Sequence, residues 1–172
     1  MKIEVLSKSH PQHSAIEGTG MFATEAIPKG DTVCIFAGEE ITIPELQERY
    51  AQGTERIDDP FQIASDKYLD LYQPYIFFNH SCDPNAGLRG RGKLFSLRDI
   101  EPGEEITFDY STSEWTDDEA WRTPWNELWR VPCTCGSSLC RGEIRTFPSL
   151  SAERKEYYRK NDALPDFILE RL

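Results

Sequence analysis

Residues 75–85, which read YIFFNHSCDPN, constrain the possible folds of this chain more than any other stretch. An aromatic, apolar run typical of a buried strand stops at Asn-His-Ser-Cys, four side chains that can hydrogen-bond or bind a metal. Asp83-Pro84-Asn85 then favours a turn, because proline fixes φ and asparagine tolerates left-handed geometry. We therefore expect a sharp turn that holds a cluster of functional groups directly behind a buried strand.

A Gly-x-Gly turn, Gly18-Thr19-Gly20, lies near the start of the chain and leads into an apolar stretch. Glycine lets the backbone approach a ligand closely and adopt positive φ. The third glycine and the following helix of a dinucleotide-binding fingerprint are missing, so the turn does not indicate a dinucleotide site. Further along, a predicted strand at 105–110 ends in Phe108-Asp109-Tyr110. Phe108 and Tyr110 are two residues apart, so on a strand they face the same way.

Five cysteines are present, an odd number that disfavours a disulfide framework. Cys34 lies within a predicted strand at 32–36, where a buried, inert thiol is expected. Cys133, Cys135 and Cys140 are crowded into eight residues, which indicates a metal site. Zinc in structural sites takes four tetrahedral ligands, often thiolates, so these three cysteines leave one position to be supplied from elsewhere.

Taken together, FFNHSC, the Gly-x-Gly turn, the Phe-Asp-Tyr strand end and Cys-x-Cys-x4-Cys-Arg-Gly resemble the SET-domain protein lysine methyltransferases with a post-SET zinc motif. The resemblance implies a mostly β fold with short helices, in which several small sheets surround a threaded, pseudoknot-like C-terminal segment. It also implies a SET domain over residues 1–130 with a variable insert at about 44–70, a post-SET segment at 131–145 and a helical tail at 146–172.

The same resemblance assigns roles to particular residues. Tyr110 is the expected catalytic residue, while Phe108 and Tyr75 are expected in the substrate pocket, where Phe in place of Tyr favours di- or trimethylation. The expected structural zinc ligands are Cys82, Cys133, Cys135 and Cys140. The expected contacts of S-adenosylmethionine are Glu17, Gly18, Thr19, Gly20, Asn79, His80 and Tyr110.

The chain departs from the family pattern just before Asn79. Members commonly carry a cofactor-contacting Arg there, and the nearest residue to that position is Ile76. They also carry a cofactor-contacting Tyr, for which Tyr68, Tyr72 and Tyr75 are all candidates.

Thirty acidic against 19 basic residues give a net charge of −11. Such a surface repels phosphate backbones, so direct nucleic-acid binding is not expected, whereas a basic protein such as a histone tail would be attracted. The charge serves solubility equally well. No apolar run approaches the roughly 20 residues that span a bilayer. We expect a monomer with an intracellular location, nuclear in a eukaryote and cytoplasmic in a prokaryote.

Two other functions remain open: a SET-fold module that binds peptides without catalysis, and an enzyme that keeps the cofactor pocket but methylates a small molecule. The retained Asn79, His80 and Tyr110 disfavour the first, and the unusual stretch 72–78 leaves room for the second. The tryptophans Trp121, Trp125 and Trp129 recur every four residues after Trp115, which favours a buried helical stripe. The alternative is a lid that holds a basic substrate with the acidic residues 117–119.

Local signals also predict individual elements. Residues 44–52 should form a short helix with a proline in its first turn, and Ser151 should cap a helix at 152–160 before Pro165 starts a last short one. Strands are expected near the start of the chain and at 61–71 and 95–98, and residues 10–14 are expected to form a loop.

Overall fold

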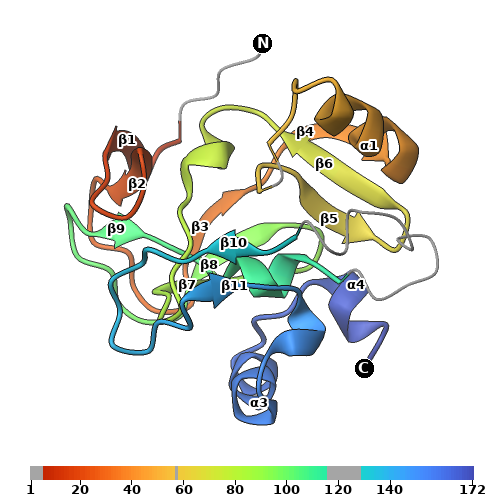
Figure 1. Cartoon of the computed structure of the whole chain (residues 1–172). Coiled ribbons are helices and arrows are strands. Elements are labelled where there is room, and N and C mark those ends of the chain that lie inside the picture. Colours follow the sequence, from red (N-terminus) through yellow and green to blue (C-terminus); the bar gives the residue numbers. More distant parts are fainter. Residues whose placement is uncertain (1–5, 57, 116–128) are drawn as a thin grey trace.

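Strands of two to five residues build the molecule, in four small antiparallel sheets among the residues that can be described (Figure 1). The computed structural model describes residues 6–56, 58–115 and 129–172. The mostly β fold expected from the sequence is confirmed. The first sheet has the order β1-β2-β9, with β1 Ser9–His13, β2 Thr19–Ala23 and β9 Glu105–Ile106.

The other three sheets are formed by strands between residues 32 and 144. The second has the order β3-β8-β7, with β3 Thr32–Ile35, β8 Lys93–Ser96 and β7 Ala86–Arg89. The third has the order β4-β6-β5, with β4 Gly38–Thr42, β6 Lys67–Leu71 and β5 Phe61–Ala64. The fourth pairs β10 Val131–Pro132 with β11 Glu143–Ile144.

Helix α1, Ile43–Ala51, matches the short helix expected at 44–52, with Pro44 in its first turn. The Thr42 side chain accepts from the Glu45 backbone N–H while the Glu45 carboxylate accepts from the Thr42 backbone, a reciprocal arrangement that satisfies two otherwise unpaired donors. Ile43 and Leu46 turn inward. None of the helices in the described ranges has the length and apolar character needed to cross a membrane.

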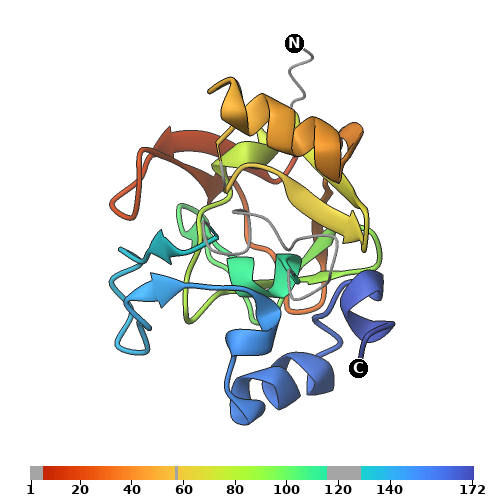
Figure 2. The same ribbon diagram turned by 45° about the vertical axis from the view of Figure 1, so that its right-hand side comes forward.

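The tail forms α3, Ala152–Lys160, and α4, Asp166–Leu169. The Ser151 hydroxyl accepts from the Arg154 N–H at 3.2 Å, and Pro165 directly precedes α4, so both expected helix starts are confirmed. α1 and α3 lie at opposite ends of the molecule in both views (Figures 1 and 2). The tail packs on β8 through a shared core of Phe95, Leu97, Phe147, Tyr158 and Phe167.

Two local predictions were wrong. Tyr75–Phe77 form the 3₁₀ helix η1 instead of a strand, and the Phe77 N–H donates to the Pro74 carbonyl at 3.0 Å. This single turn buries Tyr75 and Phe78 without any neighbouring strand to pair with. Residues expected to form a loop at 10–14 instead lie largely in β1, because an edge strand with both faces in water can carry polar side chains throughout.

Residues 107–109 run parallel to residues 79–81, which brings the two sequence motifs together. The Phe108 N–H donates to the Asn79 carbonyl at 3.2 Å, and the Ser81 N–H donates to the Phe108 carbonyl at 3.1 Å. The predicted strand 105–110 therefore ends as β9 at Ile106. Tyr110 instead opens the 3₁₀ helix η2, Tyr110–Ser113.

Glu114, directly after η2, is a fully buried carboxyl group. Its Oε1 accepts from the Tyr68 hydroxyl, and its Oε2 has no hydrogen-bond partner among the described residues. Burial raises the pKa of Glu114 to about 8.

Between about pH 4.3 and pH 8 the unfolded chain has lost the Glu114 proton while the folded chain keeps it. The free energy of unfolding therefore falls as the pH rises, by up to about 1.4 kcal/mol per pH unit. Glu114→Gln cannot ionise. We expect its free energy of unfolding, relative to the wild type, to increase from about pH 5 to about pH 8 in urea unfolding. Wild-type and variant curves that stay parallel over this range would contradict the raised pKa.

Candidate active site

Tyr110 is held by two hydrogen bonds, one to the backbone of Phe78 and one to the side chain of His80. Its hydroxyl donates to the Phe78 carbonyl at 2.9 Å, and its backbone N–H donates to His80 Nδ1 at 3.1 Å. The His80 and Tyr110 rings meet edge to face with centroids 5.4 Å apart. The expected contact between the two motifs is therefore present, with Tyr110 fixed from both ends.

Asn79 fastens the Gly-x-Gly turn to this arrangement. Its buried amide donates to the carbonyls of Glu17 and Thr19, at 3.0 and 3.3 Å, and to Glu105 Oε1 at 2.8 Å. A Cβ at Gly20 would lie 2.1 Å from that same Glu105 oxygen, so any other residue there would displace the Glu105 carboxylate from Asn79. The side chain of Asn79 therefore positions the loop.

A cavity of about 330 Å³ opens beside Tyr110. The expected cofactor contacts Glu17, Gly18, Thr19, Asn79 and Tyr110 line it, and Gly20 lies outside the lining. The cavity is also lined by residues to which the sequence gave no role, namely Arg56, Asp58, Asp59, Ile76 and Phe77. Residues 53–60 read only as a polar, flexible stretch. The sequence signal that could have identified these residues is the acidic pair Asp58 and Asp59 close to Arg56.

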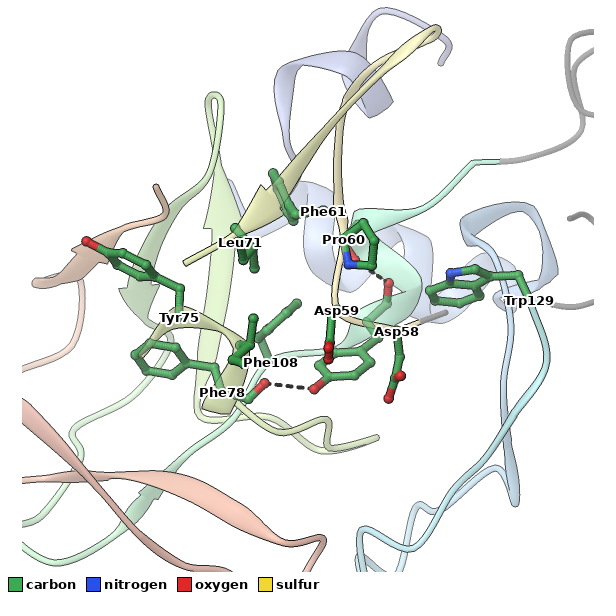
Figure 3. A pocket seen from close by; sticks show the side chains of 12 residues that line it. Asp58, Asp59, Pro60, Phe61, Leu71, Tyr75, Phe78, Phe108 and Trp129 are labelled. Atoms are coloured by element: carbon green, nitrogen blue, oxygen red, sulfur yellow. Dashed lines mark hydrogen bonds between the residues drawn. The ribbon is translucent and has the colours of Figure 1, made fainter. Parts of the chain in front are cut away.

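Figure 3 shows a second, narrow cavity, of about 20 Å³. It shares Asp58, Asp59, Ile76 and Tyr110 with the first. Its volume holds about one water molecule. The predicted substrate-pocket residues Phe108 and Tyr75 both line it, as does Trp129. Phe108 and Tyr110 do face the same way, with ring centroids 4.9 Å apart.

His80 lines a third small cavity, bounded by Val131 and Pro132 of β10 and by Cys135. This cavity shares Glu17, Asp58, Asn79 and Tyr110 with the cavity of about 330 Å³. The Gly-x-Gly turn, the central motif and the cysteine-rich segment therefore converge on one connected set of cavities around Tyr110.

Electrostatics keep the Tyr110 hydroxyl protonated. Burial raises the pKa of Tyr110 above its usual value, and the carboxylates of Asp58, Asp59 and Glu17 raise it further. Burial and the charge of Asp58 also raise the pKa of Asp59, to about 6. Tyr110 can thus orient a partner by hydrogen bonding, while a tyrosinate base is disfavoured.

Trp115 and Trp129 lie in different environments. Trp129 is buried with Ile41, Leu46 and Tyr68, and the partly buried Trp115 stacks on Phe147 with ring centroids 5.5 Å apart, so both pack on the core. Trp121, Trp125 and the acidic residues 117–119, which the lid alternative needs, lie outside the described residues.

A cluster of metal-ligating groups lies beside the small cavity that His80 and Cys135 line. Ligand atoms of His80, Cys82, Cys133 and Cys135 lie within 4.8 Å of one another, and the Cys82 and Cys133 sulfurs are 3.7 Å apart. Cys140 borders this group, with its Sγ 3.8 Å from the Cys133 carbonyl oxygen. Burial raises the pKa of Cys135, but hydrogen bonds from backbone N–H groups and from neighbouring thiols outweigh it and lower the value to about 7.

His80 is a hydrogen-bond donor in this cluster. Its Nδ1 accepts from the Tyr110 N–H, and burial lowers its pKa to about 4, so the ring is neutral with its proton on Nε2. Nε2 lies 3.3 Å from the Cys82 sulfur, the geometry of an N–H donated to sulfur. A nitrogen that carries a proton cannot bind a metal, so within this group the thiols are better suited than His80 to hold one.

Asp109 connects the site to the rest of the C-terminal chain. The Arg141 guanidinium donates to both Asp109 oxygens, at 2.7 and 2.8 Å, and the Tyr158 hydroxyl donates at 2.8 Å. Burial of Asp109 would raise its pKa, yet these donors, chiefly Arg141, hold it below its usual value. The backbone N–H of Arg141 also donates to the Cys82 sulfur, at 3.3 Å.

Comparison with known sequences gives a consistent result. The family model described as the SET domain matches residues 18–111. Two similar proteins named histone-lysine N-methyltransferase, H3 lysine-4 specific, come from Cryptococcus neoformans and Chaetomium globosum and are 34% and 36% identical over 142 and 145 residues. Another, histone-lysine N-methyltransferase SUV39H2 of Xenopus tropicalis, is 32% identical over 151 residues.

These matches cover 75%, 75% and 74% of this chain. They cover 9% and 12% of the two fungal proteins and 36% of the Xenopus protein. The chain therefore spans only a minor part of the length of these relatives.

Proposed function

This chain belongs to the SET-domain family, and we propose that it is an S-adenosylmethionine-dependent protein-lysine N-methyltransferase. The observation that carries the proposal is the position of the Tyr110 hydroxyl. It is fixed on the Phe78 carbonyl, at the wall shared by a cavity of about 330 Å³ and a narrow aromatic cavity. The larger cavity suits a cofactor, and the narrow one, which holds about one water molecule, suits the amine end of a lysine side chain.

S-adenosylmethionine, when bound, supplies a methyl group on a positively charged sulfur. The residues that would hold it are those lining the larger cavity, with Glu17, Gly18 and Thr19 on one side and Asn79 and Tyr110 on the other. The lining by Gly18 and Thr19 supports this fit, since both belong to the Gly-x-Gly turn. His80, another predicted contact, lines the adjoining cavity.

The chain's own contribution to methyl transfer is alignment and desolvation. A lysine ammonium has a pKa of about 10.4 in water and must lose its proton before it can react. Phe78, Phe108 and Tyr75 surround the narrow cavity with aromatic walls, which disfavour a charged amine. The Tyr110 hydroxyl then orients the neutral amine along one line of approach, the main requirement of an in-line displacement.

A basic protein such as a histone tail is the proposed substrate. The net charge of −11 and the carboxylates of Glu17, Asp58 and Asp59 around the cavities suit a Lys- and Arg-rich segment. Relatives carry the names of histone methyltransferases. In a eukaryote this substrate would be met in the nucleus, and in a prokaryote in the cytoplasm.

Tyr110→Phe removes the orienting hydroxyl and should lower the rate of methyl transfer about a hundred-fold or more, the usual cost of losing one positioned hydrogen-bonding group. The measurement is label transfer from S-adenosylmethionine to core histones and to a basic-protein extract. Tyr157→Phe, at a half-exposed tyrosine of α3, is the matched control and should retain the wild-type rate. Cofactor binding without any protein label would favour the peptide-binding or small-molecule alternatives.

Phe108→Tyr should shift the product from di- and trimethyl-lysine towards monomethyl-lysine. Phe108 lines the narrow cavity beside Tyr110, and a second hydroxyl there would hold a water that occupies the space of added methyl groups. Intact-mass analysis of a good substrate at completion measures the outcome. A wild-type enzyme that stops at one methyl group while still active would contradict this assignment.

We further propose a structural zinc held by Cys82, Cys133, Cys135 and Cys140. Metal analysis should find about one zinc per chain, and Cys140→Ser should lower the affinity more than His80→Gln does. With Co²⁺ in place of zinc, the wild type and His80→Gln should share one four-thiolate absorption spectrum that Cys140→Ser lacks. Cys34→Ala, at a buried thiol outside the cluster, should bind normally. A spectrum altered by His80→Gln alone would make His80 the ligand.

A further inference from the structure

Arg56 is the one cationic side chain among the described residues that line the cavity of about 330 Å³. It comes from the loop before β5, far in sequence from the Gly-x-Gly turn and from Asn79. The other charged groups of the lining, Glu17, Asp58 and Asp59, are all acidic. The charge of this cavity is therefore uneven, with one guanidinium placed among three carboxylates.

Its ion pairs hold Arg56 in the cavity wall. Arg56 Nη2 lies 3.3 Å from a Glu17 oxygen and 3.2 Å from an Asp58 oxygen, and Nε lies 3.3 Å from the other Asp58 oxygen. These contacts use Nε and Nη2 only. The Nη1 group has no hydrogen-bond partner among the described residues, so the guanidinium keeps donors for a further acceptor.

The proposed cofactor carries charged groups that correspond to these charged side chains. Its amino-acid end carries a carboxylate beside an ammonium, and its sulfur is positively charged. The three acidic side chains suit the two positive groups but repel the carboxylate. A carboxylate taken out of water must be paired or hydrogen-bonded, and Ile76 and Phe77 of the same wall offer no side-chain donor. Arg56 alone supplies the complementary charge.

We propose that Arg56 binds the carboxylate of S-adenosylmethionine, an assignment that rests on the proposed function and extends it. Glu17 and Asp58 act as positioning residues that orient the guanidinium before the cofactor arrives. A planar guanidinium presents parallel N–H groups to a carboxylate, a stronger and more directional contact than a neutral donor provides.

The test compares two ligands on the zinc-loaded full chain by calorimetry: S-adenosylmethionine and its decarboxylated analogue, which keeps the ammonium and the sulfonium. The wild type should bind the first about ten- to a hundred-fold more tightly. Arg56→Gln should lose a similar factor for S-adenosylmethionine and change little for the analogue. Arg56→Lys should fall in between.

Arg91→Gln is the matched control, since Arg91 is equally exposed (62% against 61% of the side chain) and pairs with Glu40 outside the cavity. It should bind both ligands like the wild type. Equal losses for both ligands in Arg56→Gln, or none for either, would overturn the assignment and leave the proposed function intact. A wild type that binds neither ligand would overturn the proposed function and this assignment together.

Discussion

The buried carboxylate of Asp109 is the constraint on which the arrangement of the site depends. An ionised group with almost no exposure must be fully paired, and removing one partner of such a pair commonly costs about 3–5 kcal/mol. Its donors come from three separate segments: the backbone N–H of Ser111, the guanidinium of Arg141 and the hydroxyl of Tyr158. Satisfying one charge therefore requires η2, the cysteine-rich segment and α3 to meet.

Tyr110 follows Asp109 directly, so the contacts that fix Asp109 also limit the position of the Tyr110 backbone. Its backbone is fixed by His80 on one side while its hydroxyl rests on Phe78. The same His80 ring donates to the Cys82 sulfur, so a single imidazole connects the thiol cluster to the Tyr110 backbone. Arg154 of α3 also donates to the Cys82 carbonyl. The thiol cluster and the tail thus belong to the support of the active site.

Much of this could be predicted because several signals are local. The Thr42 and Ser151 caps and the cysteine spacing depend on residues a few positions apart, and the motif around Asn79 is contiguous. The wrong predictions fell where tertiary context decides. Residues 75–77 have the composition of a strand but no strand to pair with, and β1 looks like a loop because it is an exposed edge. Arg56 carries no motif, so only the fold brings it to the cavity.

The electrostatics of the site change along the path that a substrate amine would take. Asp58 and Asp59 favour a cationic amine where the two cavities meet, and Asp59, with a pKa of about 6, is mostly ionised at neutral pH. Beyond them, Phe78 and Phe108 favour a neutral amine. A lysine amine would have to be captured as an ammonium and to react as a free amine, and these two states need opposite environments. The acidic and the aromatic residues that line the narrow cavity provide both. Because burial and the same carboxylates keep the Tyr110 hydroxyl protonated, its proton stays on the Phe78 carbonyl and its oxygen could accept an N–H from the neutral amine.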